Sequence, residues 1–187
     1  MGDADFKCRR CGREVSYDQH RSSRFCPQCG ALLNSRCRVR HWVFQFNPEI
    51  YRWFDWMKES RATEQWLTSR YAKSIHTGDK VAVWASGKNA GVYALGEVTT
   101  DPTKRPLAKE QEEYYTDKEE TGKFREKRSV TIRYLMATIE RPLLVDYCSK
   151  DPELLDMAVL RQPQGTNFRL TPGEWQRMRE LVNQNTC

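Results

Sequence analysis

Long hydrophobic runs and histidines are the features that this sequence most clearly lacks. Its 187 residues contain no run of 18 apolar residues, which excludes a membrane-spanning helix. The first ten residues, MGDADFKCRR, contain no apolar stretch, so we expect no secretory signal and a cytoplasmic protein. The three histidines, His20, His41 and His76, do not form a convincing Ser/His or Cys/His nucleophile system.

Sequence motifs of known catalytic sites are also missing. The chain has no G-x-S-x-G, no phosphate-binding P-loop, no H-E-x-x-H and no array of paired carboxylates. We therefore expect a protein that binds its target without catalysing a reaction. A hydrophobic content of 39%, with 11% aromatic residues, is enough for a packed core.

Seven cysteines are present, and four of them form a regular pattern near the N-terminus. Cys8 and Cys11 make one C-x2-C pair, Cys26 and Cys29 make a second, and a glycine follows each pair. This spacing is typical of a structural zinc site, in which glycine lets backbone N–H groups reach the thiolates. Disulfides are the alternative, but the odd cysteine count and the missing signal disfavour them. We predict one structural Zn2+ held by all four sulfurs.

Positive charge gathers in the same segment. Residues 1–40 hold nine Lys and Arg against four acids, whereas the rest of the chain holds 22 against 21. Four thiolates and one Zn2+ would add about −2, so the segment stays basic. Such asymmetry indicates an anionic partner such as nucleic acid. We expect the segment to need the metal to fold, with His20 in a loop and a small core of Phe25, Leu32 and Leu33.

We assign residues 1–38 to a zinc ribbon and residues 39–187 to a second domain. Hydrophobic alternation predicts strands over 41–47, 80–86, 91–98 and 129–138. Helices are predicted over 49–59, 151–159 and 171–183, and Thr171-Pro172-Gly-Glu174 is a capping box for the last of them. A further short helix is predicted to begin at Thr63. Residues 101–128 read as a long loop with at most one exposed helical turn. This pattern predicts a small, curved α+β barrel.

Trp84 stands out in the strand pair formed by 80–86 and 91–98. It points to the face opposite Val83 and Ala85, just before the donor-rich loop Ser86–Asn89. A ring in that position either packs under a helix or forms one wall of a slot for a flat ligand. The residues alone leave both alternatives open.

Several segments carry a family likeness: HWVFQFNP, GDKVAVWASG, GVYALGEV and QGTNFRLT. Together they resemble the EVE domain of the PUA-like superfamily and, more distantly, YTH domains, over residues 41–182. The resemblance implies a pseudo-barrel of five to six mostly antiparallel strands with peripheral helices and a pocket at one mouth. Similar domains accept a chemically modified base there, and prokaryotic ones are often coupled to modification-dependent restriction systems.

Carried over by position, the resemblance implies a base pocket, and basic residues around its mouth are the candidates for contacts to the nucleic-acid backbone. The pocket residues are Trp42, Asn47, Pro48, Trp66, Trp84, Ser86, Gly87, Asn89 and Asn167. The backbone candidates are Arg70, Lys73, Lys88 and Arg169. Stacking contributes about 1–3 kcal/mol per base, and a methyl group adds about 1–3 kcal/mol of discrimination. The region that supplies further cage aromatics in YTH domains has no tryptophan here, so a complete three-walled methyl cage is not expected.

Three classes of function are consistent with these features. The leading hypothesis is a non-enzymatic reader of a methylated or hydroxymethylated base, with cytosine in DNA as the expected target, in a restriction or defence system. The first alternative is a general RNA-binding module for tRNA or rRNA. The second is an adaptor whose zinc ribbon contacts a nuclease or motor partner. The sequence leaves the oligomeric state open.

Overall fold

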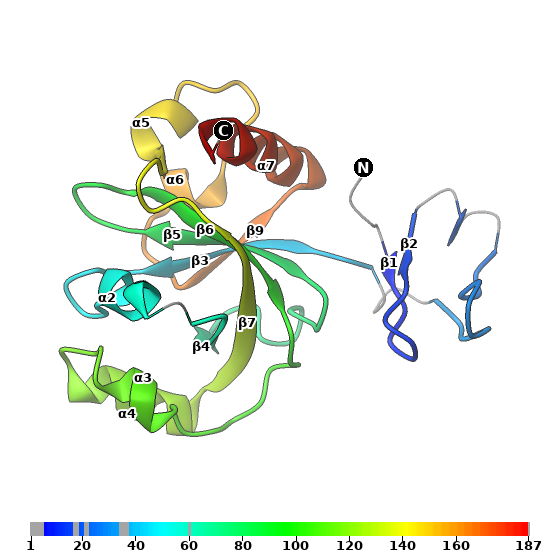
Figure 1. Cartoon of the computed structure of the whole chain (residues 1–187), viewed down its shortest axis with the longest axis horizontal. Helices are drawn as coiled ribbons and strands as arrows, with labels where there is room; N and C mark the ends of the chain where they lie inside the picture. Colours follow the sequence, from blue (N-terminus) through cyan, green and yellow to red (C-terminus); the bar gives the residue numbers. More distant parts are fainter. Residues whose placement is uncertain (1–5, 17–18, 21–22, 34–37, 60, 187) are drawn as a thin grey trace. The chain divides into compact units, whose positions relative to one another are not determined.

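The computed structural model describes residues 6–16, 19–20, 23–33, 38–59 and 61–186. The chain divides into two compact units, Met1–Arg40 and His41–Cys187 (Figure 1). Each unit has hydrophobic packing of its own. Within the described ranges, no helix combines the length and the apolar character that crossing a bilayer requires.

Among its described residues, the N-terminal unit contains two short strands and two tight turns. β1 (Phe6–Lys7) pairs antiparallel with β2 (Glu14–Val15), and an isolated bridge joins Phe25 to Leu32. The core contains Phe6, Cys8, Val15, Cys26 and Leu33. The core prediction is correct for Leu33 and wrong for Phe25 and Leu32, which are each 55% exposed. Opposite members of an antiparallel bridge point to the same side, and here that side faces solvent.

The C-terminal unit is a curled, mixed sheet with strand order β4-β7-β6-β5-β3-β9 and the short β8 paired to β6 (Figure 1). The strands are β3 (His41–Phe46), β4 (Thr63–Thr68), β5 (Lys80–Ala85), β6 (Gly91–Val98), β7 (Arg128–Ala137), β8 (Leu143–Leu144) and β9 (Asn167–Leu170). The helices are α2 (Trp53–Lys58), α3 (Lys109–Glu112), α4 (Lys118–Glu126), α5 (Val145–Cys148), α6 (Ala158–Arg161) and α7 (Pro172–Thr186). Among the described strands, β3 and β5 pair in parallel and the other pairings are antiparallel. This architecture confirms the predicted α+β pseudo-barrel.

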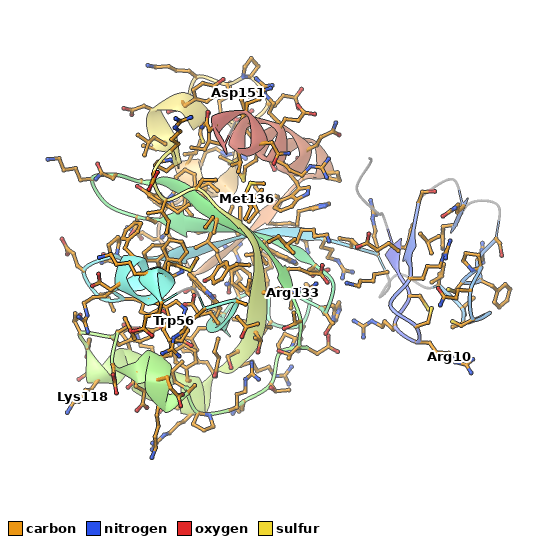
Figure 2. All side chains as sticks on the ribbon, viewed as in Figure 1. Arg10, Trp56, Lys118, Arg133, Met136 and Asp151 are labelled. Carbon is orange, nitrogen blue, oxygen red and sulfur yellow. The ribbon has the colours of Figure 1, made fainter. Side chains whose placement is uncertain are left out.

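Alternation along the strands sends side chains to two cores on opposite faces of the sheet. On β5, Val83 and Ala85 enter the first core, which α2 covers. Trp84 enters the second core, which lies against α5, α6 and α7. Side chains fill the space on both faces of the sheet (Figure 2), and Met136 of β7 packs against the second core. The first core is the one that borders the cavities described below.

One side chain joins β4 and β9, the two edge strands of the curled sheet. Asn167 is 4% exposed. Its Oδ1 accepts a hydrogen bond from the N–H of Ser69 at 2.9 Å, and its Nδ2 donates to the carbonyl oxygen of Leu67 at 3.1 Å. The amide thus takes the place of a backbone ladder between the edges, and both of its polar groups are satisfied.

Residues 63–68 form strand β4, so the predicted short helix from Thr63 is wrong. Glu64, Trp66 and Thr68 are buried, while the residues between them are partly exposed, which is the period of a strand. The pairing of Trp66 with Val130 on β7 fixes the register. The tryptophan therefore points into the first core.

Two other segments differ from prediction. Residues 101–128 contain α3 and α4, and the Asp117 side chain caps α4 by accepting the N–H of Glu119 at 2.8 Å. Residues 151–159 are mostly turns that lead into α6. The capping box of α7 is confirmed: the Thr171 N–H donates to the Glu174 carboxylate at 2.6 Å, and the Glu174 N–H donates to Thr171 Oγ1 at 3.2 Å.

Candidate functional site

Four cysteine sulfurs lie close together in the N-terminal unit. The Sγ atoms of Cys8, Cys11, Cys26 and Cys29 are all within 4.8 Å of one another. The Cys8–Cys29 and Cys11–Cys26 pairs are each 3.6 Å apart, well beyond the length of about 2.05 Å of a disulfide bond. Four sulfurs at about 2.3 Å from a tetrahedral Zn2+ would lie about 3.8 Å apart. The cluster therefore fits a metal ion held entirely by protein ligands.

Both cysteine pairs are held in the same kind of turn. The Gly12 N–H donates to the Cys8 carbonyl oxygen at 2.8 Å, and the Gly30 N–H donates to that of Cys26 at 2.9 Å. The two glycines have φ values of 74° and 69°, which a side chain would disfavour. His20 is not a member of the cluster. The repeated C-x2-C-G sequence thus produces two equivalent turns that present their sulfurs to one point.

The C-terminal unit has a cavity of about 210 Å3 on the first-core side of the sheet. We call it the aromatic cavity because Phe46, Tyr51, Trp66 and Tyr115 line it. Its other lining residues are Gln45, Asn47, Ile50, Leu67, Ser86, Glu120, Gly165 and Thr166. This lining contains no lysine or arginine, and Glu120 is its one charged side chain. Drug-sized ligands fill about 300–1,000 Å3, so this smaller cavity suits a single flat ring system.

Contacts among the aromatic side chains fix the walls of the cavity. Tyr51 and Tyr115 stack with their ring centroids 4.4 Å apart and their planes 16° from parallel. Trp66 meets Tyr51 and Phe46 edge-on, with centroid distances of 6.3 Å and 6.1 Å. Trp66 is only 5% exposed, so its neighbours hold the ring in one orientation. Such walls need little ordering when a ligand enters.

A buried carboxyl group lies behind these walls. Glu64 accepts hydrogen bonds from Trp53 Nε1 at 3.1 Å, from Gln111 Nε2 at 3.2 Å and from the Tyr134 hydroxyl. The Tyr134 hydroxyl also accepts from Trp66 Nε1 at 3.3 Å, so the network reaches the cavity. Burial raises the pKa of Glu64 to about 8, although the surrounding donors act in the opposite direction.

The loop before β9 supplies another wall, and Gln45 of β3 holds it. The Gln45 N–H donates to the Thr166 carbonyl oxygen at 2.9 Å, and its Nε2 donates to those of Pro163 at 2.7 Å and Gly165 at 3.1 Å. A Cβ atom on Gly165 would lie 2.9 Å from the Phe168 ring. Glycine therefore permits the close packing of this loop.

A second cavity, of about 520 Å3, shares Asn47 and Ser86 with the aromatic cavity. We call it the loop cavity because it lies between the turn after β3 and the β5–β6 loop. Its lining residues are Asn47, Pro48, Glu49, Phe54, Ala85, Ser86, Gly87, Lys88, Asn89 and Tyr93. Ser86 is fixed between the cavities, since its N–H and Oγ both donate to the Phe46 carbonyl oxygen, at 2.9 Å and 3.1 Å.

The structure distributes the predicted pocket residues over several places. Six of the nine line one or both cavities: Asn47, Pro48, Trp66, Ser86, Gly87 and Asn89. Asn167 uses its amide at the seam between β4 and β9. Trp84 is 3% exposed in the second core, on the face of the sheet opposite the aromatic cavity. Of the two alternatives open from sequence, packing under a helix is the one that the structure shows for Trp84.

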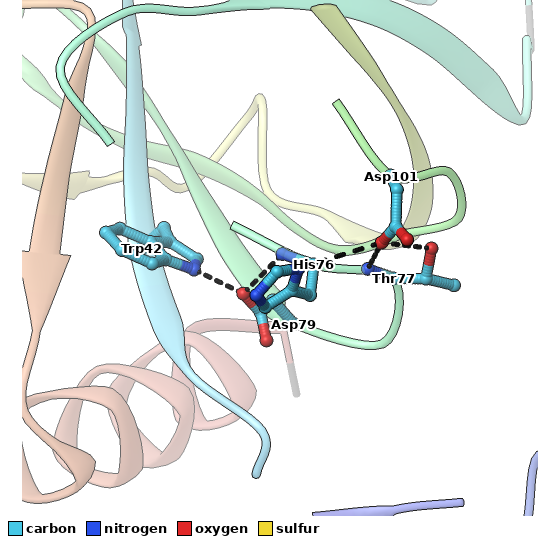
Figure 3. Close-up of polar contacts among 5 residues, drawn as sticks. All are labelled: Trp42, His76, Thr77, Asp79 and Asp101. Carbon is cyan, nitrogen blue, oxygen red and sulfur yellow. Dashed lines mark hydrogen bonds and ion pairs between the residues drawn. The ribbon is translucent and has the colours of Figure 1, made fainter. Parts of the chain in front are cut away.

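Trp42, which Figure 3 shows with its partners, is fully buried near the start of β3, whereas Phe46 at the other end of the strand lines the aromatic cavity. Its Nε1 donates to Asp79 Oδ2 at 2.8 Å, and the same oxygen accepts the N–H of His76 at 3.0 Å. Nearby, Asp101 Oδ1 accepts the N–H of Thr77 at 2.9 Å. Trp42 is not among the residues that line the two cavities. Its role here is to anchor the turn before β5.

The four predicted backbone contacts lie in two regions. Arg70 and Arg169 both face the Tyr71 ring, with their Cζ atoms 5.4 Å and 5.6 Å from its centroid. Lys73 is exposed two residues beyond that tyrosine, whereas Lys88 lines the loop cavity. None of the four forms an ion pair with another described residue. These cations are therefore available to an anionic ligand.

Several lining residues of the aromatic cavity were not predicted from sequence, and they include Tyr51, Tyr115 and Glu120. Tyr51 and Tyr115 are joined by an isolated antiparallel bridge, although 64 positions separate them in the chain. The available signal is the pair Tyr114-Tyr115 in an otherwise polar stretch. A loop with two adjacent tyrosines is a candidate for packing onto a core.

Comparisons with known proteins agree with this fold. A structure of a hypothetical protein from Leishmania major is 20% identical, with a TM-score of 0.60 and coverage of 80% of this chain and 98% of that chain. Rpa0253 from Rhodopseudomonas palustris is 17% identical, with a TM-score of 0.58 and coverage of 78% and 94%. Human THYN1, solved in complex with DNA containing 5-methylcytosine, is 14% identical, with a TM-score of 0.55 and coverage of 77% and 98%. At these identities the likeness establishes the fold alone.

A match to a family model establishes more than the fold. None of the curated proteins matches the sequence. A family model described as the EVE domain matches residues 40–181, well over half of the 187 residues. The chain therefore belongs to the EVE domain family.

Proposed function

We propose that this protein is a non-enzymatic reader that holds one 5-methylcytosine or 5-hydroxymethylcytosine base of DNA in the aromatic cavity. One observation carries the proposal: four aromatic side chains and no lysine or arginine line this cavity. A phosphate group would need cationic partners, whereas a neutral flat base gains about 1–3 kcal/mol from stacking. The complex of human THYN1 with 5-methylcytosine DNA, which has the same fold, supports this choice of ligand.

Two polar groups of the cavity are suited to read a cytosine edge. The Glu120 carboxylate, which Lys123 orients through an ion pair, can accept a hydrogen bond from the N4 amino group. Asn47 uses Oδ1 to accept the N–H of Glu49 at 3.0 Å, and its Nδ2 has no partner among the described residues. That Nδ2 can donate to N3 or O2 of the base. Thymine carries the same methyl group but presents a carbonyl to Glu120, so it should bind less well.

We also propose that the ion of the four-cysteine cluster is Zn2+, because soft thiolate ligands favour it. Cys8, Cys11, Cys26 and Cys29 would hold it and fill all four positions, so its contribution is structural. The apolar core of this unit is small. Folding of the N-terminal unit should therefore depend on the ion.

The base preference can be measured by fluorescence anisotropy with oligonucleotides that differ at one position. The variable base is cytosine, 5-methylcytosine, 5-hydroxymethylcytosine, thymine or N6-methyladenine, in duplex and single-stranded DNA and in RNA of the same sequence. We expect the modified cytosines to bind most tightly and thymine to bind about tenfold more weakly, which is the value of one charged hydrogen bond. Glu120→Gln should reduce the difference in affinity between the modified cytosines and thymine, since an amide can donate to the thymine carbonyl.

Trp66→Leu and Trp84→Leu form a matched pair of variants. Both remove a buried tryptophan from the same sheet, but only Trp66 lines the aromatic cavity. Trp66→Leu should weaken binding of the modified base by about 1–3 kcal/mol, whereas Trp84→Leu should keep the affinity. Circular dichroism would establish that both variants are folded. Equal affinity for all bases, or equal losses in the two variants, would refute the proposal, and a preference for RNA would replace DNA as the target.

A further inference from the structure

The two cavities lie on either side of a partition formed by Asn47 and Ser86. Ser86 is tied to the Phe46 carbonyl oxygen by two hydrogen bonds, so the partition is well fixed. Each nucleotide of a strand is joined covalently to the next. A strand that places one base in the aromatic cavity therefore continues on both sides of that base, and the loop cavity is a hollow that adjoins the partition.

The loop cavity has an apolar floor. Phe54 and Tyr93 meet at a centroid distance of 4.9 Å with their planes 75° apart. The Tyr93 hydroxyl donates to the Asn89 carbonyl oxygen at 2.8 Å, which ties the β5–β6 loop to this floor. Pro48 and Phe54 are both partly exposed. They offer apolar surface for a deoxyribose or the face of a base.

The rim of the loop cavity carries a cation that the aromatic cavity lacks. Lys88 is exposed and forms no ion pair with a described residue, not even with Glu49 of the same cavity. Gly87 before it has φ 90°, and a Cβ atom there would meet nothing within 4 Å. The approach to Lys88 is therefore open. One cavity thus suits an uncharged base, and its neighbour suits a group with an anionic part.

We infer that the loop cavity binds the nucleotide next to the modified base in the same strand, with its sugar or base on Pro48 and Phe54 and its phosphate on Lys88. This inference rests on the proposed function of the aromatic cavity. It goes further in that the protein would read a dinucleotide step. Recognition would then depend on the backbone linkage on one side of the modified base and not on the other.

A double-mutant cycle tests the contact. Its protein change is Lys88→Ala, and its ligand change is an uncharged methylphosphonate in place of the phosphate on either side of a single 5-methylcytosine. Lys88→Ala should weaken binding about two- to fivefold and reduce the slope of log K against log salt by about 0.7–0.9. One of the two methylphosphonates should weaken the wild type by a similar factor and have no further effect on Lys88→Ala. Lys150→Ala, which removes an exposed lysine beyond α5, is the matched control and should behave as wild type.

The possible outcomes separate the two proposals. If each methylphosphonate weakens binding to Lys88→Ala by the same factor as binding to the wild type, the dinucleotide inference is overturned. The reader function would still stand if the base preference and the effect of Trp66→Leu persist. An equal loss in Lys150→Ala would also overturn it, because the effect would then be one of net charge. Failure to bind any oligonucleotide would overturn the reader function and this inference together.

Discussion

Replacing Glu64 with glutamine should remove a pH dependence from folding stability. In the folded protein, burial raises the pKa of Glu64 from its ordinary value of 4.5 to about 8. Between these pH values the folded state keeps the proton and the unfolded state releases it. The contribution of Glu64 to the free energy of unfolding is therefore fully present below about pH 4.5 and is lost as the pH rises towards 8. A difference of 8 − 4.5 = 3.5 units, at about 1.36 kcal/mol per unit, sets an upper limit of about 5 kcal/mol.

Urea unfolding followed by tryptophan fluorescence measures this effect. Stability is determined for the wild type and Glu64→Gln at several values between about pH 5 and pH 8. The amide has the shape of the protonated carboxyl and can donate to Tyr134, so the network can persist. The other titrating groups are common to both proteins and cancel in the difference. We expect the advantage of the wild type to shrink by several kcal/mol across this range. A difference that is constant with pH would show that folded Glu64 does not hold its proton, and would refute the reasoning.

Three more predictions follow from other parts of the molecule. Purified protein should contain one Zn2+ per chain by elemental analysis. Cys11→Ser should lose the ion, and NMR spectra should then show an unfolded N-terminal unit beside a folded second unit. Full retention of the metal in Cys11→Ser would contradict this prediction. Asn167→Ala should destabilise the C-terminal unit by about 1–3 kcal/mol and speed amide exchange at Ser69, and unchanged exchange would argue against the seam. Asp79→Ala should leave the Trp42 and His76 donors unpaired and cost about 2–4 kcal/mol in thermal unfolding, without altering base preference at temperatures where the protein is folded.

Local spacing explains why some features could be predicted from sequence. The cysteine cluster depends on C-x2-C pairs, each followed by a glycine that the turn requires, so its local parts are all visible in the chain. The hairpin of β5 and β6 consists of two mostly apolar runs joined by a short polar loop that contains Gly87, and nearly every residue of the two strands is buried. The start of α7 has a capping box whose two hydrogen bonds join residues three positions apart. Each of these features is decided by neighbours in the sequence.

Strand β4 could not be predicted because two of its three buried positions are polar. Glu64 and Thr68 share the buried face with Trp66, so hydrophobic alternation is hidden. Their burial depends on partners from distant segments, since Gln111 and Tyr134 bond Glu64 and the Arg128 carbonyl oxygen accepts from Thr68 Oγ1. A pattern of apolar residues does not indicate where such polar partners lie.

The candidate site was predictable only in part for a related reason. Alternation shows that Trp84 and Val83 point to opposite faces, but it does not show which face holds a cavity. Two walls, Tyr51 and Tyr115, meet through a bridge between distant segments. Only the three-dimensional structure reveals that Trp66, and not Trp84, belongs with them.

The buried carboxyl behind the aromatic cavity is better explained by orientation of the walls than by stability. As pH rises towards neutrality, Glu64 lowers the free energy of unfolding, because the unfolded chain releases its proton first. Its partners, however, are the groups that hold the cavity: Gln111 Nε2 lies 3.3 Å from the Tyr51 hydroxyl, and Tyr134 bonds Trp66. Two of the four aromatic walls are thus held from behind by one carboxyl group. Discrimination of a single methyl group is worth only about 1–3 kcal/mol, so a small displacement of these rings would remove it. We therefore expect base selectivity to decline above about pH 8, where the folded protein releases the Glu64 proton and the hydrogen bonds of Tyr134 rearrange.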